Sequence, residues 1–352
     1  MLPHPARLRS IAPAFLNQLQ RMLGTEWNLI QGLLRRDELI LPEIIRRLAQ
    51  PDGAPRFTML VNESTGVPGG TEQGGPLGMV AFMRQEARPA PHFLLDDKLV
   101  AMLENTDIAP DVPMSMFNLP FQRLYLELGR KREIQTTIPN VLSGDHVLEG
   151  AYIERGKHAD GEFLYIVMTG SPLGKSGPED DATLSVALPL NEPERPIADV
   201  ISTARRKSID EASTQGLALS PDTWAPATVH AILLLVKALL YIGLPGTRRE
   251  LHPERTTALK EAAGLKSTAK KAKAQKRADR VYDYIHIGPQ PEHVAEVSGQ
   301  PTDRAVKAHW RRGHYRLQAH GVQMTLRKLI FIQPVLVAGS AEVAASAVYK
   351  VS

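Results

Sequence analysis

The chain has 352 residues, of which 43% are hydrophobic, and it contains no cysteine. This length predicts two or three globular domains with a core large enough to need no covalent cross-links. The absence of cysteine excludes disulfide frameworks, thiolate zinc sites, iron–sulfur clusters and cysteine nucleophiles. It is also typical of a reducing compartment, so we expect a cytoplasmic protein.

Positive charge is concentrated in one part of the chain. The net charge is +4, yet residues 260–328 carry fifteen Lys and Arg against six Asp and Glu, so the remainder is net acidic. A basic region favours a polyanionic partner such as nucleic acid. It is equally typical of a solvated connector between domains.

The first fifty residues are expected to form an N-terminal helical segment, 1–50. Apolar residues recur at three- and four-residue spacings over 11–23 and 27–48, which is the period of an amphipathic helix. Gln50, Pro51, Asp52 and Gly53 then end the pattern, because Pro and Gly interrupt helices.

Residues 51–250 are expected to form an α+β core domain, with a mixed or antiparallel sheet flanked by helices. Six segments rich in β-forming residues predict its strands: 56–62, 78–84, 123–129, 146–154, 162–170 and 183–190. A helix is expected over 96–105, and two more over 200–214 and from Pro221 to Gly243.

The most apolar stretch of the chain, 231–244, is read as a buried core helix. It is shorter than the roughly 20 residues that a bilayer requires, and Lys237 interrupts it. The N-terminus also lacks the uninterrupted apolar run of a secretory signal. We therefore expect no membrane partner.

Residues 251–280 form an Ala/Lys-rich basic segment, expected to be an exposed helix or a linker. It carries eight basic residues between Lys260 and Arg280 and has no wide apolar stripe. If this segment binds nucleic acid, the expected contacts are Lys270, Lys271, Lys273, Lys276 and Arg277.

The remaining residues, 281–352, are expected to form a small β-rich module. Its three predicted strands are 281–288, 307–318 and 327–337, and a short helix and loop are expected near 292–305. Apolar groups on both faces of the strand at Leu329–Ile332 predict a buried central position in that sheet.

The sequence HWRRGHYR within this module has the highest concentration of potentially functional side chains in the chain. In one continuous strand, alternate residues share a face. Trp310, Arg312, His314, Arg316 and Gln318 would then lie on one side, and His309, Arg311, Tyr315 and Leu317 on the other. Guanidinium groups suit phosphates and carboxylates, and an indole can stack on a base, so the first face favours nucleic acid or an acidic peptide.

Two other interpretations of the same residues stay open. His309 and His314 would act as an acid and base in a metal-independent ribonuclease if a bulge at Gly313 brought them together. Alternatively, the Arg and His side chains make structural pairs with carboxylates such as Asp283. We expect no metal site here and no cofactor, because the histidines point apart in a strand and the loop GSPLGKSG does not match a nucleotide-binding pattern.

The segment 105–129 is the second distinctive one. Pro110 and Pro113 keep the chain extended, and NLPF leads into an alternating strand. From the residues alone, an entry turn into a half-buried strand is the expectation.

Two blocks together resemble a known family: DVPMSMFNLPFQRLYLEL at 111–128, and HWRRGHYRLQAHG with RKLIFIQPVLV at 309–337. They are similar to phage- and plasmid-borne proteins that include the type V-A anti-CRISPR proteins, which lower the messenger RNA of the effector nuclease. The resemblance implies recognition of the nascent N-terminal peptide of that nuclease during translation, followed by loss of its transcript.

The partners so implied are the nascent polypeptide in a bacterial cytoplasm, with mRNA or the ribosome as further contacts. The resemblance supplies no catalytic residues, so a binding protein is expected rather than an enzyme. The alternatives are the ribonuclease and a plasmid-maintenance protein that binds DNA. The binding residues we expect are Trp310, Arg311, Arg312, His314, Arg316, Lys270, Lys271, Lys273, Arg277, Pro120 and Phe121.

Overall fold

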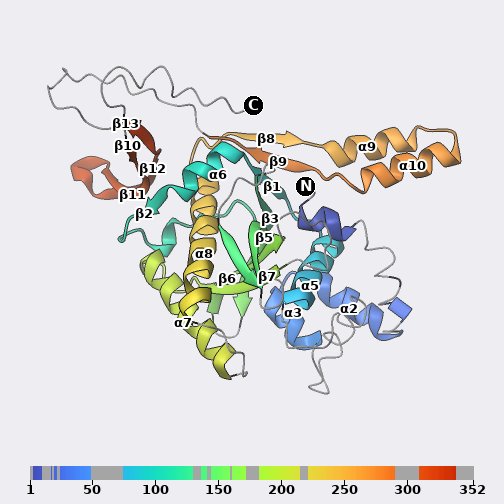
Figure 1. The fold of residues 1–352 in the computed structure, drawn as a ribbon, viewed down its shortest axis with the longest axis horizontal. Coiled ribbons are helices and arrows are strands. Elements are labelled where there is room, and N and C mark those ends of the chain that lie inside the picture. The colour runs from blue at the N-terminus through green and yellow to red at the C-terminus, as the bar shows by residue number, and fades with distance from the viewer. Residues whose placement is uncertain are drawn as a thin grey trace.

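An eight-stranded mixed sheet forms the centre of the molecule (Figure 1). The computed structural model describes residues 3–9, 17, 20–21, 24–48, 74–129, 136–140, 144–158, 161–171, 182–214, 221–289 and 309–337. The sheet has the order β7-β6-β5-β3-β1-β9-β8, and β4 pairs with β5. Its strands are β1 (His92–Leu95), β3 (Arg123–Leu128), β4 (Thr137–Asn140), β5 (Gly144–His158), β6 (Gly161–Ser171), β7 (Ala182–Pro189), β8 (Arg249–His252) and β9 (Tyr284–Ile287).

The fold is α+β, as the sequence predicts. The strands predicted at 123–129, 146–154, 162–170 and 183–190 are confirmed as β3, β5, β6 and β7. β1 runs parallel to β3 and β9, whereas every other pair in this sheet is antiparallel. The mixed pairing arises because the parallel partners are far apart in the chain and are joined by long crossovers.

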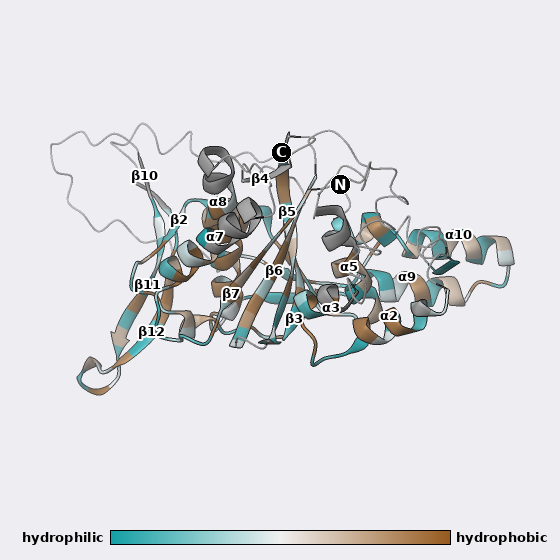
Figure 2. Cartoon of the chain, turned by 90° about the horizontal axis from the view of Figure 1, so that it is seen from below, coloured by the Kyte–Doolittle hydropathy of each residue, from teal (hydrophilic) through white to brown (hydrophobic). Residues whose placement is uncertain are grey.

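Helices cover both faces of the sheet, which gives three layers (Figures 1 and 2). On one face, Leu124, Leu126 and Leu128 of β3 belong to the cluster that contains the apolar side of the helices α6, α7 and α8. On the other face, Tyr125 belongs to a second cluster with α2, α3 and α5. The helices are α2 (Glu26–Arg35), α3 (Leu41–Leu48), α5 (Gly74–Ala87), α6 (Asp97–Glu104), α7 (Ile197–Thr214) and α8 (Pro221–Gly243).

The strand predicted at 78–84 is wrong, because these residues lie in helix α5. Val80, Ala81, Phe82 and Met83 are all buried, so the sequence shows a continuous apolar run with no helical period. Such a run fits a buried strand and a buried helix equally well. The buried Arg84 on α5 also donates hydrogen bonds to backbone carbonyl oxygens of the α2–α3 region.

The helix predicted over 27–48 is two helices, α2 and α3, separated at residues 36–40. Pro42 lies in the first turn of α3, where the missing N–H costs nothing, whereas in the interior of one long helix it would remove a hydrogen bond. The predicted strand 56–62 and all of 11–23 except residues 17 and 20–21 lie outside the described residues.

Helix α8 is the buried core helix that the sequence predicts. Residues such as Leu235, Val236 and Leu239 are fully buried against the sheet and its neighbouring helices. Among the described residues no helix has the length and apolarity needed to cross a membrane.

The three strands predicted after residue 280 do not share one sheet. β9 belongs to the central sheet, whereas the later residues form two small sheets, β10-β13 and β12-β11-β2. These strands are β2 (Thr106–Ile108), β10 (His309–Arg311), β11 (Gly313–His320), β12 (Leu326–Ile332) and β13 (Val335–Val337). Within the described residues β12 is an edge strand and is only half-buried, so the buried central position expected for Leu329–Ile332 is wrong.

The basic segment 251–280 contains two helices, α9 (Glu254–Ala263) and α10 (Thr268–Ala278), which pack side by side as a hairpin between β8 and β9 (Figure 1). Small residues such as Ala262 and Ala278 are its buried positions. The segment is therefore helical, and it projects from the body of the molecule. The predicted helix and loop near 292–305 lie outside the described residues.

Candidate functional site

The HWRRGHYR sequence is divided between two strands rather than lying in one. β10 ends at Arg311 and pairs with β13, while β11 begins at Gly313 and pairs with β12 and β2. The single strand predicted over 307–318 is therefore wrong, because it is interrupted at Arg312 and its two parts belong to different sheets. Gly313, the first residue of β11, is tightly packed: a Cβ there would lie 2.7 Å from the Ile332 carbonyl oxygen and 2.8 Å from Thr106 Oγ1.

Alternation does hold within β11. Tyr315 is fully buried, packs against Phe331 at a ring separation of 4.9 Å, and donates a hydrogen bond of 2.8 Å to the Lys237 carbonyl oxygen. His314 and Arg316 lie on the opposite side, where His314 is half-buried and Arg316 is exposed. The buried side anchors β11, which leaves the cationic side available for contact.

Arg312, the residue between β10 and β11, makes an exposed ion pair with Asp107 of β2. Its guanidinium lies 3.3 Å from the Asp107 carboxylate, and the two side chains are 70% and 61% exposed. The carboxylate suggested by the sequence, Asp283, is elsewhere: it accepts hydrogen bonds from the backbone N–H and hydroxyl of Thr256 at the start of α9. A pair this exposed contributes little to stability, so Arg312 can exchange Asp107 for another anion.

Lys237 of α8 contacts β2, and the sequence did not predict it as a residue of this site. Its ammonium group donates a hydrogen bond of 2.9 Å to the Thr106 carbonyl oxygen. Burial lowers the pKa of Lys237 to about 8, and the nearby Asp107 and Glu104 carboxylates partly oppose this effect. The one available signal was a lysine in the middle of an apolar helix, which indicates a buried polar partner.

The side chains of His309, Trp310 and Arg311 lie outside the described part of the structure. The backbone of β10 places these residues next to β11 along the chain. The pairing of His309 with His314 as an acid and base therefore stays a prediction, as does a binding face that includes Trp310.

The basic face of α10, defined by Lys270, Lys271, Lys273, Lys276 and Arg277, is exposed to solvent. In the described structure none of these five side chains has an ion-pair partner. Ser267 begins the helix, and its hydroxyl accepts a hydrogen bond from the Lys270 N–H. In both views α10 and β11 lie at opposite ends of the molecule (Figures 1 and 2), so the basic side chains described on these two elements belong to two separate surfaces.

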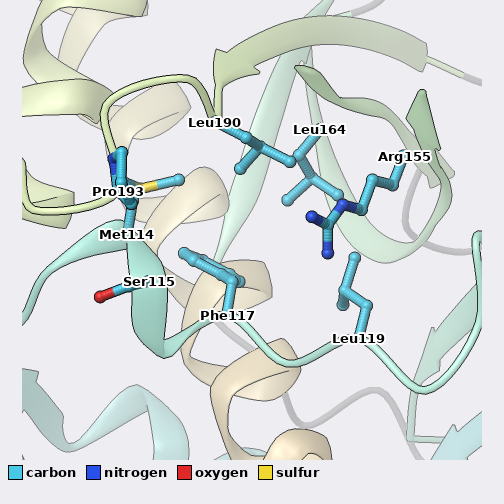
Figure 3. Close-up of a pocket in the computed structure, with 8 residues that line it drawn as sticks. All are labelled: Met114, Ser115, Phe117, Leu119, Arg155, Leu164, Leu190 and Pro193. Carbon is cyan, nitrogen blue, oxygen red and sulfur yellow. The ribbon is translucent and has the colours of Figure 1, made fainter. Parts of the chain in front are cut away.

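A small pocket lies where the segment 105–129 approaches β5, β6 and the loop after β7 (Figure 3). Its volume is about 120 Å³. Its lining is mostly apolar: Met114, Ser115, Phe117, Leu119, Arg155, Leu164, Leu190 and Pro193. The sequence could not predict it, because residues from four separate segments meet there.

Arg155 is the one cationic group of the pocket. Its Nε donates a hydrogen bond of 2.8 Å to the Glu162 carboxylate. Figure 3 shows the rest of its guanidinium directed toward Leu119 and Phe117. The pocket therefore combines apolar walls with donors at one side, which suits an apolar side chain and its backbone carbonyl.

The expected residues Pro120 and Phe121 follow the pocket directly. Pro120 is half-buried, and Phe121 is 41% exposed with its ring 5.9 Å from that of Phe93. The segment is thus the entry into β3 that the sequence predicts, and it also forms one wall of the pocket through Phe117 and Leu119.

Comparison with known families decides the identity. The model of the anti-CRISPR type V subtype A2 family, described as AcrVA2-like, matches residues 93–339. The chain belongs to this family. The match includes the pocket segment, the α9–α10 hairpin and both blocks on which the resemblance was based.

A solved structure titled "Crystal structure of AcrVA2" is similar to this chain with a TM-score of 0.42 and 12% identity, over 93% of this chain and 98% of that one. A search of curated protein sequences finds no match. Membership of the family rests on the family match to residues 93–339, and it assigns the chain to the anti-CRISPR proteins.

Proposed function

We propose that this protein binds the nascent N-terminal peptide of a type V-A CRISPR effector nuclease and thereby promotes loss of the nuclease's mRNA. The family match supports a CRISPR-related target. The main support for peptide binding is the pocket of about 120 Å³ beside the NLPF segment.

The pocket is of the right kind for one large apolar side chain. Phe117 and Leu164 provide buried apolar walls, and Ser115 is an exposed residue of the lining. A nascent chain begins with methionine, whose flexible thioether fills irregular apolar spaces. The Arg155 guanidinium would donate hydrogen bonds to backbone carbonyl oxygens of the same peptide.

The two cationic surfaces would contact the translating complex. The basic face of α10 suits the phosphates of mRNA or ribosomal RNA, because exposed lysines release counterions when they bind a polyanion. At the other end we propose that Trp310, Arg311, Arg312, His314 and Arg316 contact acidic groups of the peptide or RNA. The transcript would then be removed by a nuclease other than this chain.

The experiment is a binding titration with a fluorescently labelled peptide from the N-terminus of the nuclease. Ser115→Trp enlarges an exposed residue of the pocket lining without altering the core, and it should weaken binding by at least about tenfold. Thr257→Trp is the matched control, since Thr257 is exposed on the distant α9, and it should bind normally.

The same two variants should then be compared in cells by measuring nuclease mRNA. Ser115→Trp should leave the transcript at the level seen without inhibitor, and Thr257→Trp should lower it as the wild type does. Equal peptide affinity for both variants would contradict a role for the pocket. Normal binding by a variant that no longer lowers the mRNA would separate peptide recognition from transcript loss.

A further inference from the structure

Three potential metal ligands come together on one face of β8 and β9, at the base of the α9–α10 hairpin. The antiparallel register places Glu250 directly opposite His286. His252 is two residues further along β8 and therefore lies on the same face as Glu250. The ligand atoms of Glu250, His252 and His286 all lie within 4.8 Å of one another.

Neighbouring groups lie beside both imidazoles. The His252 ring stacks on Tyr284, with centroids 4.8 Å apart and planes 5° from parallel, and the Tyr284 hydroxyl donates a hydrogen bond of 3.0 Å to Glu254. His286 Nε2 lies 3.7 Å from an Asp96 carboxylate oxygen. A carboxylate beside a ligating histidine is the usual outer partner that fixes its ring in metal sites.

We infer that Glu250, His252 and His286 bind a divalent transition-metal ion such as Zn²⁺. Two imidazole nitrogens and one carboxylate oxygen are a typical donor set for this ion, which they approach to about 2.0–2.2 Å. The three side chains are 53%, 35% and 30% exposed, so small rotations bring the donors together without disturbing the core. Glu250 also faces Arg248 through its other oxygen, Oε2 at 3.5 Å, which leaves Oε1 on the His252 side.

The site lies where the two ends of the α9–α10 hairpin meet the central sheet. β8 leads directly into α9, and β9 follows α10, so an ion bound to residues of both strands cross-links the two ends of the hairpin (Figure 1). The ion therefore restrains the direction in which the basic face of α10 projects. This inference is independent of the proposed function.

The test is a calorimetric titration of the full chain, first with Zn²⁺ and then with Mg²⁺. We expect one equivalent of Zn²⁺ to bind, and Mg²⁺, which prefers all-oxygen sites, to bind far more weakly. His252→Ala, His286→Ala and Glu250→Gln should each lower Zn²⁺ affinity by at least about tenfold. His230→Ala, which removes an exposed histidine on α8, is the matched control and should bind as the wild type does.

Two further measurements complete the test. Circular dichroism of each variant should match the wild type, and Glu250→Gln, which keeps the side-chain shape, covers the case in which a histidine variant fails to fold. Trypsin should cleave at the α10 lysines more slowly when Zn²⁺ is present, in the wild type and in His230→Ala only. Equal Zn²⁺ affinity in wild type, His252→Ala and Glu250→Gln, or no stoichiometric binding, would overturn the inference.

Discussion

Replacement of Phe331 and of Arg316 by alanine should separate packing from recognition at the β11–β12 surface. The Phe331 ring packs edge-on against Tyr241, with ring centroids 5.3 Å apart, and lies tilted against Tyr315, with centroids 4.9 Å apart. Phe331 is nevertheless only half-buried, because β12 is an edge strand. A fully buried Phe→Ala change costs about 3–5 kcal/mol, so roughly half of that, about 2 kcal/mol, is expected here. Arg316 is exposed and makes no packing contact of this kind, so its replacement should cost less than about 0.5 kcal/mol.

The same reasoning applies to Arg312→Ala, since the exposed pair with Asp107 contributes at most about 1 kcal/mol. Thermal melts should show Phe331→Ala about 3 °C below the wild type and both arginine variants within about 1.5 °C of it, because 1 kcal/mol shifts the midpoint of a 352-residue protein by about 1.4 °C. In a transcript-repression assay the arginine variants should be inactive although folded. If they melt as early as Phe331→Ala, the arginines are structural and the surface is not a recognition site.

Three other outcomes are expected. Burial, followed by the nearby Arg7 charge, lowers the pKa of His4 from 6.5 to about 3; the unfolded chain therefore takes up a proton below pH 6.5 that the folded chain does not. Stability should fall by about 2 kcal/mol between pH 7 and pH 5 on this account, and His4→Gln should remove that part of the slope in urea titrations at each pH. Glutamine at the lysines of the basic face of α10 should weaken RNA association and flatten its salt dependence, and salt-independent binding by the wild type would contradict the electrostatic reasoning. Purified protein should leave naked RNA intact; cleavage that His309→Ala and His314→Ala abolish would establish the ribonuclease alternative instead.

The elements that the sequence predicted correctly are those with a clear period or clear boundaries. β5, β6 and β7 are long and bounded by Gly or Pro, and α8 combines helical length with a start signal at Pro221. The strands that were missed, β1, β2, β4 and β8, have only three or four residues, which is too short for a period to be recognised. α5 was missed for a different reason, since burial on all sides removed its helical period.

The candidate sites were harder to predict than the fold, because each is assembled by pairing between distant segments. The pocket joins residues 114–119 to Arg155 and Leu190, and the metal ligands join Glu250 to His286 through the register of β8 and β9. Neither spacing matches a local motif. The basic face of α10 was visible in the sequence, because a helix displays its lysines without help from other elements.

The separation of these surfaces bears on how the proposed function would operate. The pocket and the basic face of α10 lie on different elements and have no residue in common, so under the proposed function each would bind its target while the other is occupied. If the peptide and the RNA belong to one translating complex, binding at the first surface makes binding at the second intramolecular. Loss of either surface then removes the whole gain in affinity that simultaneous binding provides, which is roughly 10²–10⁴-fold. Ser115→Trp and neutralisation of α10 should therefore each reduce activity in cells by far more than they reduce binding to isolated peptide or isolated RNA.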